Sequence, residues 1–230
     1  MPDLKDIYAH QAEQYEELVA REDYQHHILA AIQQIRPLAG LEVVELGAGT
    51  GRLTCLLAPH VKSLQIFDAS SAMLDVARAK LQKMGAANWQ ARVADHGALP
   101  AADRCADLAL AGWSLCYAAL DHPENWRAAL GQALGEMQRV LRPGGTFLIL
   151  ETLGTGFEAP HPPDVLKDYL AYLDAAGFRS TWIRTDYEFQ SLAEAEALTR
   201  FFFGDDLARQ VVDRNWTILP ECTGLWWQQA

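Results

Sequence analysis

Apolar and polar positions alternate along the chain in two periods, one typical of amphipathic helices and one of buried strands. Within the first 37 residues two helices are predicted: the first carries Tyr8 and Tyr15 at helical spacing, and the second follows Asp23, a candidate N-cap. Pro37 ends the second helix. Short apolar runs then alternate with helical patterns, which is typical of a parallel sheet with helices on both faces.

Five apolar runs predict the parallel strands of this sheet. They lie at residues 41–46, 64–67, 89–94, 107–111 and 146–151. The helices predicted between them include residues 52–58, and the tight turn Arg142-Pro143-Gly144-Gly145 leads into the fifth strand. A helix at 164–176, a strand at 178–187 and a closing strand at 225–227 follow. Between these last two strands, residues 191–215 form a predicted helical insertion that opens on the capping box Ser191-x-x-Glu194.

The first of these strands runs directly into three alternating glycines. Gly47, Gly49 and Gly51 stand between the strand and a helical pattern that begins at Arg52. Glycine permits a positive φ and lets a ligand approach bare backbone, and open α/β sheets bind ligands at the carboxyl ends of their strands. Dinucleotide folds use G-x-G-x-x-G, but Arg52 stands where the third glycine of that pattern would be.

The segment E-L-G-A-G-T-G-R at residues 45–52 resembles the first motif of the class I S-adenosylmethionine (SAM)-dependent methyltransferases. The run R-V-L-R-P-G-G-T-F-L-I-L-E at 139–151 is similar to the fifth-strand motif of the same family. The resemblance extends from Leu41 to about Trp227. It implies an α/β, Rossmann-like, doubly wound sheet of seven strands in the order 3-2-1-4-5-7-6, with strand 7 antiparallel. The first helices would form an N-terminal helical cap, and the helical insertion would join strands 6 and 7.

Acidic residues follow the second and third predicted strands. Asp68 lies 21 residues after Gly47, where a carboxylate can accept hydrogen bonds from ribose hydroxyls. Ser70 and Ser71 are better caps for the next helix, which leaves Asp68 for a ligand. By resemblance, Asp95 would meet the adenine amine, with the neighbouring His96 contacting the ring through its backbone.

The resemblance therefore implies a cofactor site for SAM in which Glu45 and the glycines hold the methionine half. Met73 either packs on the adenine or belongs to a core stripe, and Trp113 is either a wall against the methionine arm or a core aromatic. The predicted cofactor-binding residues are Tyr15, Glu45, Gly47, Ala48, Gly49, Gly51, Asp68, Ala69, Met73, Asp95, His96 and Trp113.

Composition limits the partners of the chain. A net charge of −11, from 30 acids and 19 bases, disfavours a nucleic-acid or anionic-membrane surface. The 4 cysteines form no C-x-x-C pair and no metal-ligand spacing, and the first residues lack an apolar signal core, so a cytoplasmic protein without a metal site is expected. One domain is predicted for residues 1–230, with the cap at 1–37, the cofactor-binding core at 41–151 and the insertion at 191–215.

The predicted reaction is methyl transfer to a small-molecule acceptor, which mainly requires that the acceptor be held close and aligned. Tyr15, Tyr117, His122 and Glu151 are candidates for a general base, but each is equally well explained as a cap, core or strand residue, so no catalytic residue is assigned. Phe202, in the insertion, is predicted to wall the acceptor pocket, with a dimer contact as the alternative. Two other functions stay open: a non-catalytic SAM-binding partner and an NAD-dependent oxidoreductase. A monomer and a homodimer are both compatible with the sequence.

Overall fold

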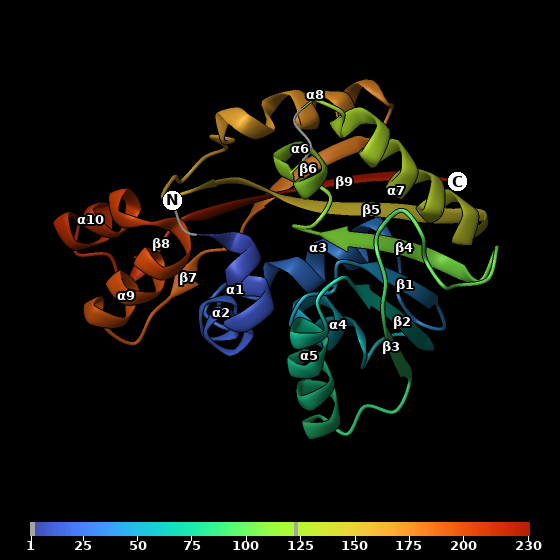
Figure 1. The fold of residues 1–230 in the computed structure, drawn as a ribbon, viewed down its shortest axis with the longest axis horizontal. Coiled ribbons are helices and arrows are strands. Elements are labelled where there is room, and N and C mark those ends of the chain that lie inside the picture. Colours follow the sequence, from blue (N-terminus) through green and yellow to red (C-terminus); the bar gives the residue numbers. More distant parts are fainter. Residues whose placement is uncertain (1–2, 122–123) are drawn as a thin grey trace.

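In residues 3–121 and 124–230, which the computed structural model describes, seven strands form one central sheet (Figure 1). The strands are β1 (Glu42–Leu46), β2 (Ser63–Asp68), β3 (Trp89–Val93), β4 (Ala106–Gly112), β5 (Leu141–Thr155), β6 (Arg179–Arg184) and β9 (Glu221–Gln229). Their order is β3-β2-β1-β4-β5-β9-β6. All neighbours pair in parallel except β9, which is antiparallel to β5 and β6. The predicted strand order and antiparallel seventh strand are confirmed.

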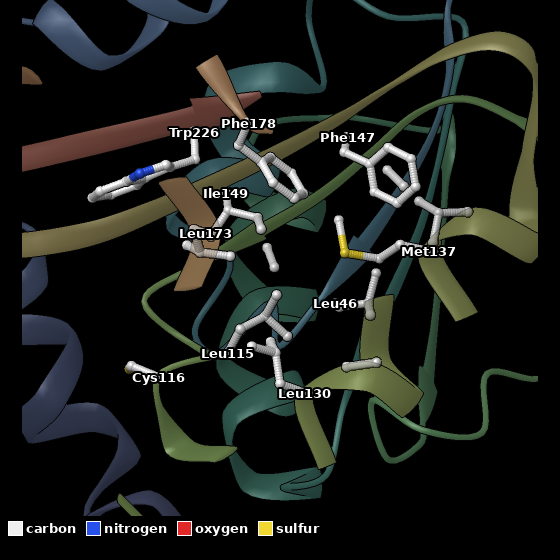
Figure 2. Packing of buried hydrophobic residues seen from close by; sticks show 14 of the residues in the cluster. Leu46, Leu115, Cys116, Leu130, Met137, Phe147, Ile149, Leu173, Phe178 and Trp226 are labelled. Atoms are coloured by element: carbon white, nitrogen blue, oxygen red, sulfur yellow. The ribbon is translucent and has the colours of Figure 1, made fainter. Parts of the chain in front are cut away.

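Helices cover both faces of the sheet, so the central strands bury side chains on both faces. In β4, Ala109 and Ala111 pack on one face, and Leu108 and Leu110 on the other. This is the continuous apolar pattern of a parallel strand buried on both sides. The first face is covered by α7 (Trp126–Val140) and α8 (Lys167–Ala175), whose contacts with the sheet appear in Figure 2. The second is covered by α3 (His27–Ile35), α4 (Arg52–Leu57) and α5 (Ser71–Lys83).

The N-terminal segment differs from the predicted pair of helices. Three helices are present: α1 (Leu4–His10), α2 (Ala12–Val19) and α3. The first predicted helix breaks at Gln11, whose backbone leaves the helical region. The predicted N-cap is wrong in position, because α3 begins at His27 and its N-cap is His26. Asp23 still satisfies the start of the helix: its carboxylate accepts hydrogen bonds from the N–H groups of His27 and Ile28 at 2.8 and 3.0 Å.

The predicted strand at 178–187 is wrong over residues 185–187, because β6 ends at Arg184. The Arg184 guanidinium donates to the Asp186 carboxylate, and one oxygen of that carboxylate accepts the N–H of Glu221 at 3.0 Å. The chain therefore turns away, and β7 (Tyr187–Glu188) pairs with β8 (Ile218–Leu219) in a separate two-stranded sheet.

The fifth strand is also longer than predicted. Instead of a turn before the strand, residues 142–145 bulge out of β5 between two pairs with β4, Ala106 with Leu141 and Leu108 with Thr146. In this bulge Gly144 has φ +77°, and the Arg142 guanidinium binds the carboxylate of Asp107 at 2.9 Å.

The predicted helical insertion is present between β6 and β9 as α9 (Leu192–Phe203) and α10 (Asp205–Asp213). Ser191 caps α9 by accepting the N–H of Glu194 at 3.2 Å, as the capping box predicts. The insertion packs on the N-terminal helices: Phe202 contacts Tyr15 of α2, with ring centroids 5.3 Å apart. Figure 1 shows α1 and α2 between this insertion and the sheet. The remaining short helices are α6 (Tyr117–Asp121) and the 3-10 turn Asp164–Leu166. Within the described ranges, no helix is both long and apolar enough to cross a membrane.

Candidate cofactor site

A cavity of about 560 Å³ opens at the carboxyl ends of β1 to β4. The chain reverses its direction of travel across the sheet between β1 and β4, which is where doubly wound sheets bind ligands. The predicted residues that line this cavity are Tyr15, Glu45, Gly47, Ala48, Gly49, Asp68, Ala69, Met73, Asp95, His96 and Trp113. Gly51 is absent from its described lining residues.

The three glycines of the loop have different surroundings. At Gly47, with φ +64°, an added Cβ would lie 2.3 Å from Ser114 Cβ, so the backbone must stay bare. At Gly49, with φ +55°, nothing lies within 4 Å, and the open space is the cavity. At Gly51 an added Cβ would lie 2.9 Å from Ala77 Cβ in α5. Gly51 therefore serves the close packing of α4 on α5, and the other two glycines form the cavity floor.

Asp68 stands at the tip of β2, as predicted, but its carboxylate is already engaged. Oδ2 accepts the N–H of Gly49 and Oδ1 accepts the N–H of Ser70, both at 2.8 Å. Ser70 caps α5 with its own side chain, which accepts the Met73 N–H at 3.3 Å. Each carboxylate oxygen can accept more than one hydrogen bond. Asp68 thus ties the glycine loop to the end of β2 and retains acceptor capacity toward the cavity.

Asp95 and His96 follow β3 at the cavity wall. The Asp95 carboxylate accepts the Gly97 N–H at 2.8 Å, which shapes the loop. The His96 ring, expected to be incidental, lies over the glycine loop: its Nε2 would be 2.8 Å from a Cβ placed on Gly47. Burial lowers the pKa of His96, so its imidazole is neutral at neutral pH. The sequence around His96 gives no signal that its ring points toward the glycine loop.

Glu45 is a buried carboxyl at the end of β1. Its Oε2 accepts the Thr54 hydroxyl at 2.6 Å, and the residue is only 2% exposed. Burial raises the pKa of Glu45 to about 8, although the hydrogen bond from Thr54 opposes this. Glu45 is therefore mainly protonated at neutral pH unless a cation enters the cavity.

Three tyrosines from two distant segments form one wall. The Tyr8 ring lies edge-on to Tyr15, with centroids 5.4 Å apart, and edge-on to Tyr117 at 5.7 Å. The hydroxyls of Tyr8 and Tyr117 are hydrogen-bonded to each other. Burial raises the pKa of all three phenols, that of Tyr15 to about 12. Tyr8 was not among the predicted site residues, although it precedes Tyr15 by two helical turns.

The cavity lining and the pKa shifts reduce the set of candidate general bases. Tyr15 and Tyr117 line the cavity as neutral phenols. Glu151 is fully buried outside the cavity lining, where its Oε1 accepts the Cys116 N–H at 3.0 Å and the Tyr169 hydroxyl at 2.9 Å. Burial raises the pKa of Glu151 to about 7. His122 lies outside the described residues.

Arg52 was predicted only as the first residue of its helix, yet it is part of the cavity wall. Its guanidinium lies 3.3 Å from the centroid of the Trp113 ring and forms an ion pair with Glu22. Burial opposes its charge, but Glu22 keeps the pKa of Arg52 above its ordinary value. Trp113 has φ +49°, an unusual backbone conformation for a bulky residue, which brings its ring to the cavity.

The sheet, the glycine loop and the acids after β2 and β3 define a doubly wound protein that binds a nucleoside-containing cofactor at its switch point. Residues 43–145 match the family described as "Methyltransferase domain". Over this segment, which is the one that carries the glycine loop and the acids after β2 and β3, the chain is similar to the SAM-dependent methyltransferases. The NAD alternative thus loses its support.

Relatives share this sequence similarity, and a solved structure shares the fold. The chain is 31% identical over 120 residues to a ubiquinone/menaquinone biosynthesis C-methyltransferase UbiE from Rubrivivax gelatinosus, covering 52% of this chain and 43% of that protein. It is 33% identical over 118 residues to a malonyl-[acyl-carrier protein] O-methyltransferase from Pectobacterium atrosepticum, covering 51% and 41%. The chain thus spans half or less of these relatives. A SAM-dependent methyltransferase from Aquifex aeolicus shares the fold, with TM-score 0.57, 15% identity and coverage of 97% and 92%.

Proposed function

We propose that this protein transfers the methyl group of SAM to a small-molecule acceptor and releases S-adenosylhomocysteine (SAH). The observation that carries the proposal is the convergence of the glycine loop, Asp68 and Asp95 on one cavity. All three follow the adjacent parallel strands β1, β2 and β3, so they form a row along one edge of the sheet. We further propose that residues 1–230 act as one methyltransferase domain.

The residues present fit this cofactor. Asp68 has acceptor capacity for the ribose hydroxyls, and Asp95 stands where it can accept from the adenine amine. Gly47 and Gly49 leave bare backbone beside the methionine part. The tyrosine wall suits a sulfonium, because a cation is attracted to the face of an aromatic ring. When bound, SAM supplies a methyl group already activated for displacement.

The protein's part in the reaction is to orient the acceptor and to exclude water. Tyr8, Tyr15 and Tyr117 line one wall of the cavity with neutral phenols. A neutral phenol can donate a hydrogen bond to an acceptor but cannot remove its proton at neutral pH. We therefore propose that the acceptor atom already has a reactive lone pair at neutral pH, so that no strong base is needed to deprotonate it. The acceptor nucleophile forms a bond to the methyl carbon as the carbon–sulfur bond breaks, and the bonding electrons remain on sulfur.

The proposal identifies the acceptor only as a small molecule. The relatives' names include a C-methyltransferase and an O-methyltransferase, and their similarity extends over 52% and 51% of this chain. That the protein binds no nucleic acid rests on the net charge of −11. A cytoplasmic location and a monomeric or homodimeric state complete the proposal.

The test has two stages. Thermal unfolding is first followed with SAM, SAH and NADH; the proposal expects stabilisation by the first two and none by the third. Methyl transfer from isotope-labelled SAM is then measured against a panel of small phenols, amines, thiols and carboxylic acids by mass spectrometry. Binding of SAM without turnover of any acceptor class would favour the non-catalytic alternative, and stabilisation by NADH alone would overturn the proposal.

A further inference from the structure

Arg52 is a largely buried cation that the fold places beside the cofactor cavity. Its side chain is 16% exposed, and that of its ion-pair partner Glu22 is 3% exposed. The guanidinium carbon lies over the Trp113 ring, 3.3 Å from its centroid. Stacking on one side and an ion pair on the other fix the plane of the guanidinium, so its position is set before any ligand binds.

The ion pair with Glu22 leaves donors of Arg52 for another partner. A guanidinium carries five N–H donors, and the bond to Glu22 uses Nη1. Among the described residues, Glu22 is the hydrogen-bond acceptor found for Arg52, while the side chain also lines the cavity. The cavity thus presents a preorganised donor group that matches a planar, bidentate anion.

The order of the strands decides which end of the cofactor reaches Arg52. If adenine lies at Asp95 after β3 and ribose at Asp68 after β2, the amino-acid end must extend across β1 toward β4. Arg52 directly follows the glycine loop after β1, and Trp113 directly follows β4. The amino-acid end of SAM carries a carboxylate, which needs a hydrogen-bonded partner in a water-poor site.

The other cation that lines the cavity among the described residues does not suit this carboxylate. Lys5 is exposed and lies in the first turn of α1, where its backbone N–H donates to the carboxylate of Asp3. The α1 helix packs on α5, whereas Arg52 directly follows the glycine loop and lies against Trp113. Arg52 is favoured because its guanidinium is largely buried and held beside Trp113, whereas Lys5 is exposed.

We propose that Arg52 binds the carboxylate of the methionine part of the cofactor, with Glu22 and Trp113 as the residues that position its guanidinium. This assignment rests on the proposed SAM site and adds to it the residue that recognises the amino-acid end. It predicts that Arg52 discriminates between ligands that differ only in that carboxylate.

The experiment compares two ligands on one variant. Calorimetry measures binding of SAH and of S-adenosyl-3-thiopropylamine, which is SAH without its carboxylate. Arg52→Gln should weaken SAH binding about 10- to 100-fold, as expected for loss of a charge-assisted bidentate contact, and change binding of the carboxylate-free ligand less than about twofold. Arg21→Gln is the matched control: Arg21 forms an ion pair with Glu194 at 2.7 Å outside this cavity, so both ligands should bind as to the wild type.

Removal of Arg52 alone leaves the buried Glu22 unpaired, so a second variant protects the test against misfolding. Glu22→Gln combined with Arg52→Gln removes both charges, and it should show the same selective loss of SAH affinity at a melting temperature close to that of the wild type. Equal losses for both ligands, or unchanged SAH affinity in the double variant, would overturn the assignment. Wild-type protein that binds neither ligand would instead overturn the proposed cofactor site itself.

Discussion

Alanine substitutions at two glycines separate the role of the loop in folding from its role in binding. Gly49 and Gly40 both have positive φ, +55° and +80°, and a Cβ at either would meet nothing within 4 Å. Only Gly49 lines the cavity. A side chain in this backbone region costs roughly 1–2 kcal/mol, which lowers the melting temperature of a protein of this size by about 2–8 °C. Both variants should show this same loss of stability.

Binding of SAH should distinguish the two variants. The Cβ of Gly49→Ala projects into the space that we assign to the cofactor, and displacement of a closely packed ligand should lower affinity at least about tenfold, or about 1.4 kcal/mol. Gly40→Ala should bind SAH as tightly as the wild type. The assay is calorimetry on each protein, with melting followed by circular dichroism. Gly49→Ala with wild-type SAH affinity would refute the reasoning that the open space at this glycine is ligand space.

Three further predictions follow from other contacts. Asp68→Asn should weaken SAH binding roughly ten- to hundredfold, since one charged acceptor is lost, whereas Asp95→Asn should have a smaller effect; calorimetry that finds the reverse order would exchange the two roles. Glu151 has its pKa raised from 4.5 to about 7, so the folded state binds more protons than the unfolded state between these values, and stability falls as pH rises through them. Glu151→Gln should reduce that fall by on the order of 3 kcal/mol, measured by urea unfolding at pH 5 and pH 8; an unchanged slope would contradict the assignment. Phe202→Ala should lower stability by about 3 kcal/mol or less through lost packing on Tyr15, with a secondary decrease in turnover; turnover loss without destabilisation would instead support a direct acceptor contact.

The predicted site was most accurate where function depends on the end of a strand. A run of apolar residues marks a parallel strand because both faces of the sheet are buried, and the residue after the run must lie at the carboxyl edge. Asp68, Asp95 and Trp113 could be placed in this way, and the structure brings them to one cavity. The glycine loop was located by the same logic, although the packing role of Gly51 became visible only from its distance to Ala77.

Contacts between distant helices could not be predicted. Tyr8 and Tyr117 are 109 positions apart, and Arg52 and Glu22 are 30 apart, so no local pattern links the members of either pair. The packing of α1 and α2 on α5 decides how the N-terminal segment reaches the site. The prediction that Phe202 walls the acceptor pocket is not supported by the cavity, because the described residues of α9 and α10 are absent from its lining.

The position of β9, inserted between β5 and the edge strand β6, has a consequence for the order in which the chain assembles during synthesis. β9 is the last strand made, yet it lies between β5 and β6, and among the described strands β6 is paired with β9 alone. The backbone hydrogen bonds of residues 21–24 likewise cannot form until residues 185–188, their partners, have been synthesised. Strands β1 to β5, which carry the glycine loop and both acids, pair among themselves much earlier. In a nascent chain, strands β1 to β5 with the glycine loop and both acids can therefore form before β6 and β9 are paired. We expect cofactor present during translation to stabilise this partial sheet and raise the yield of folded protein.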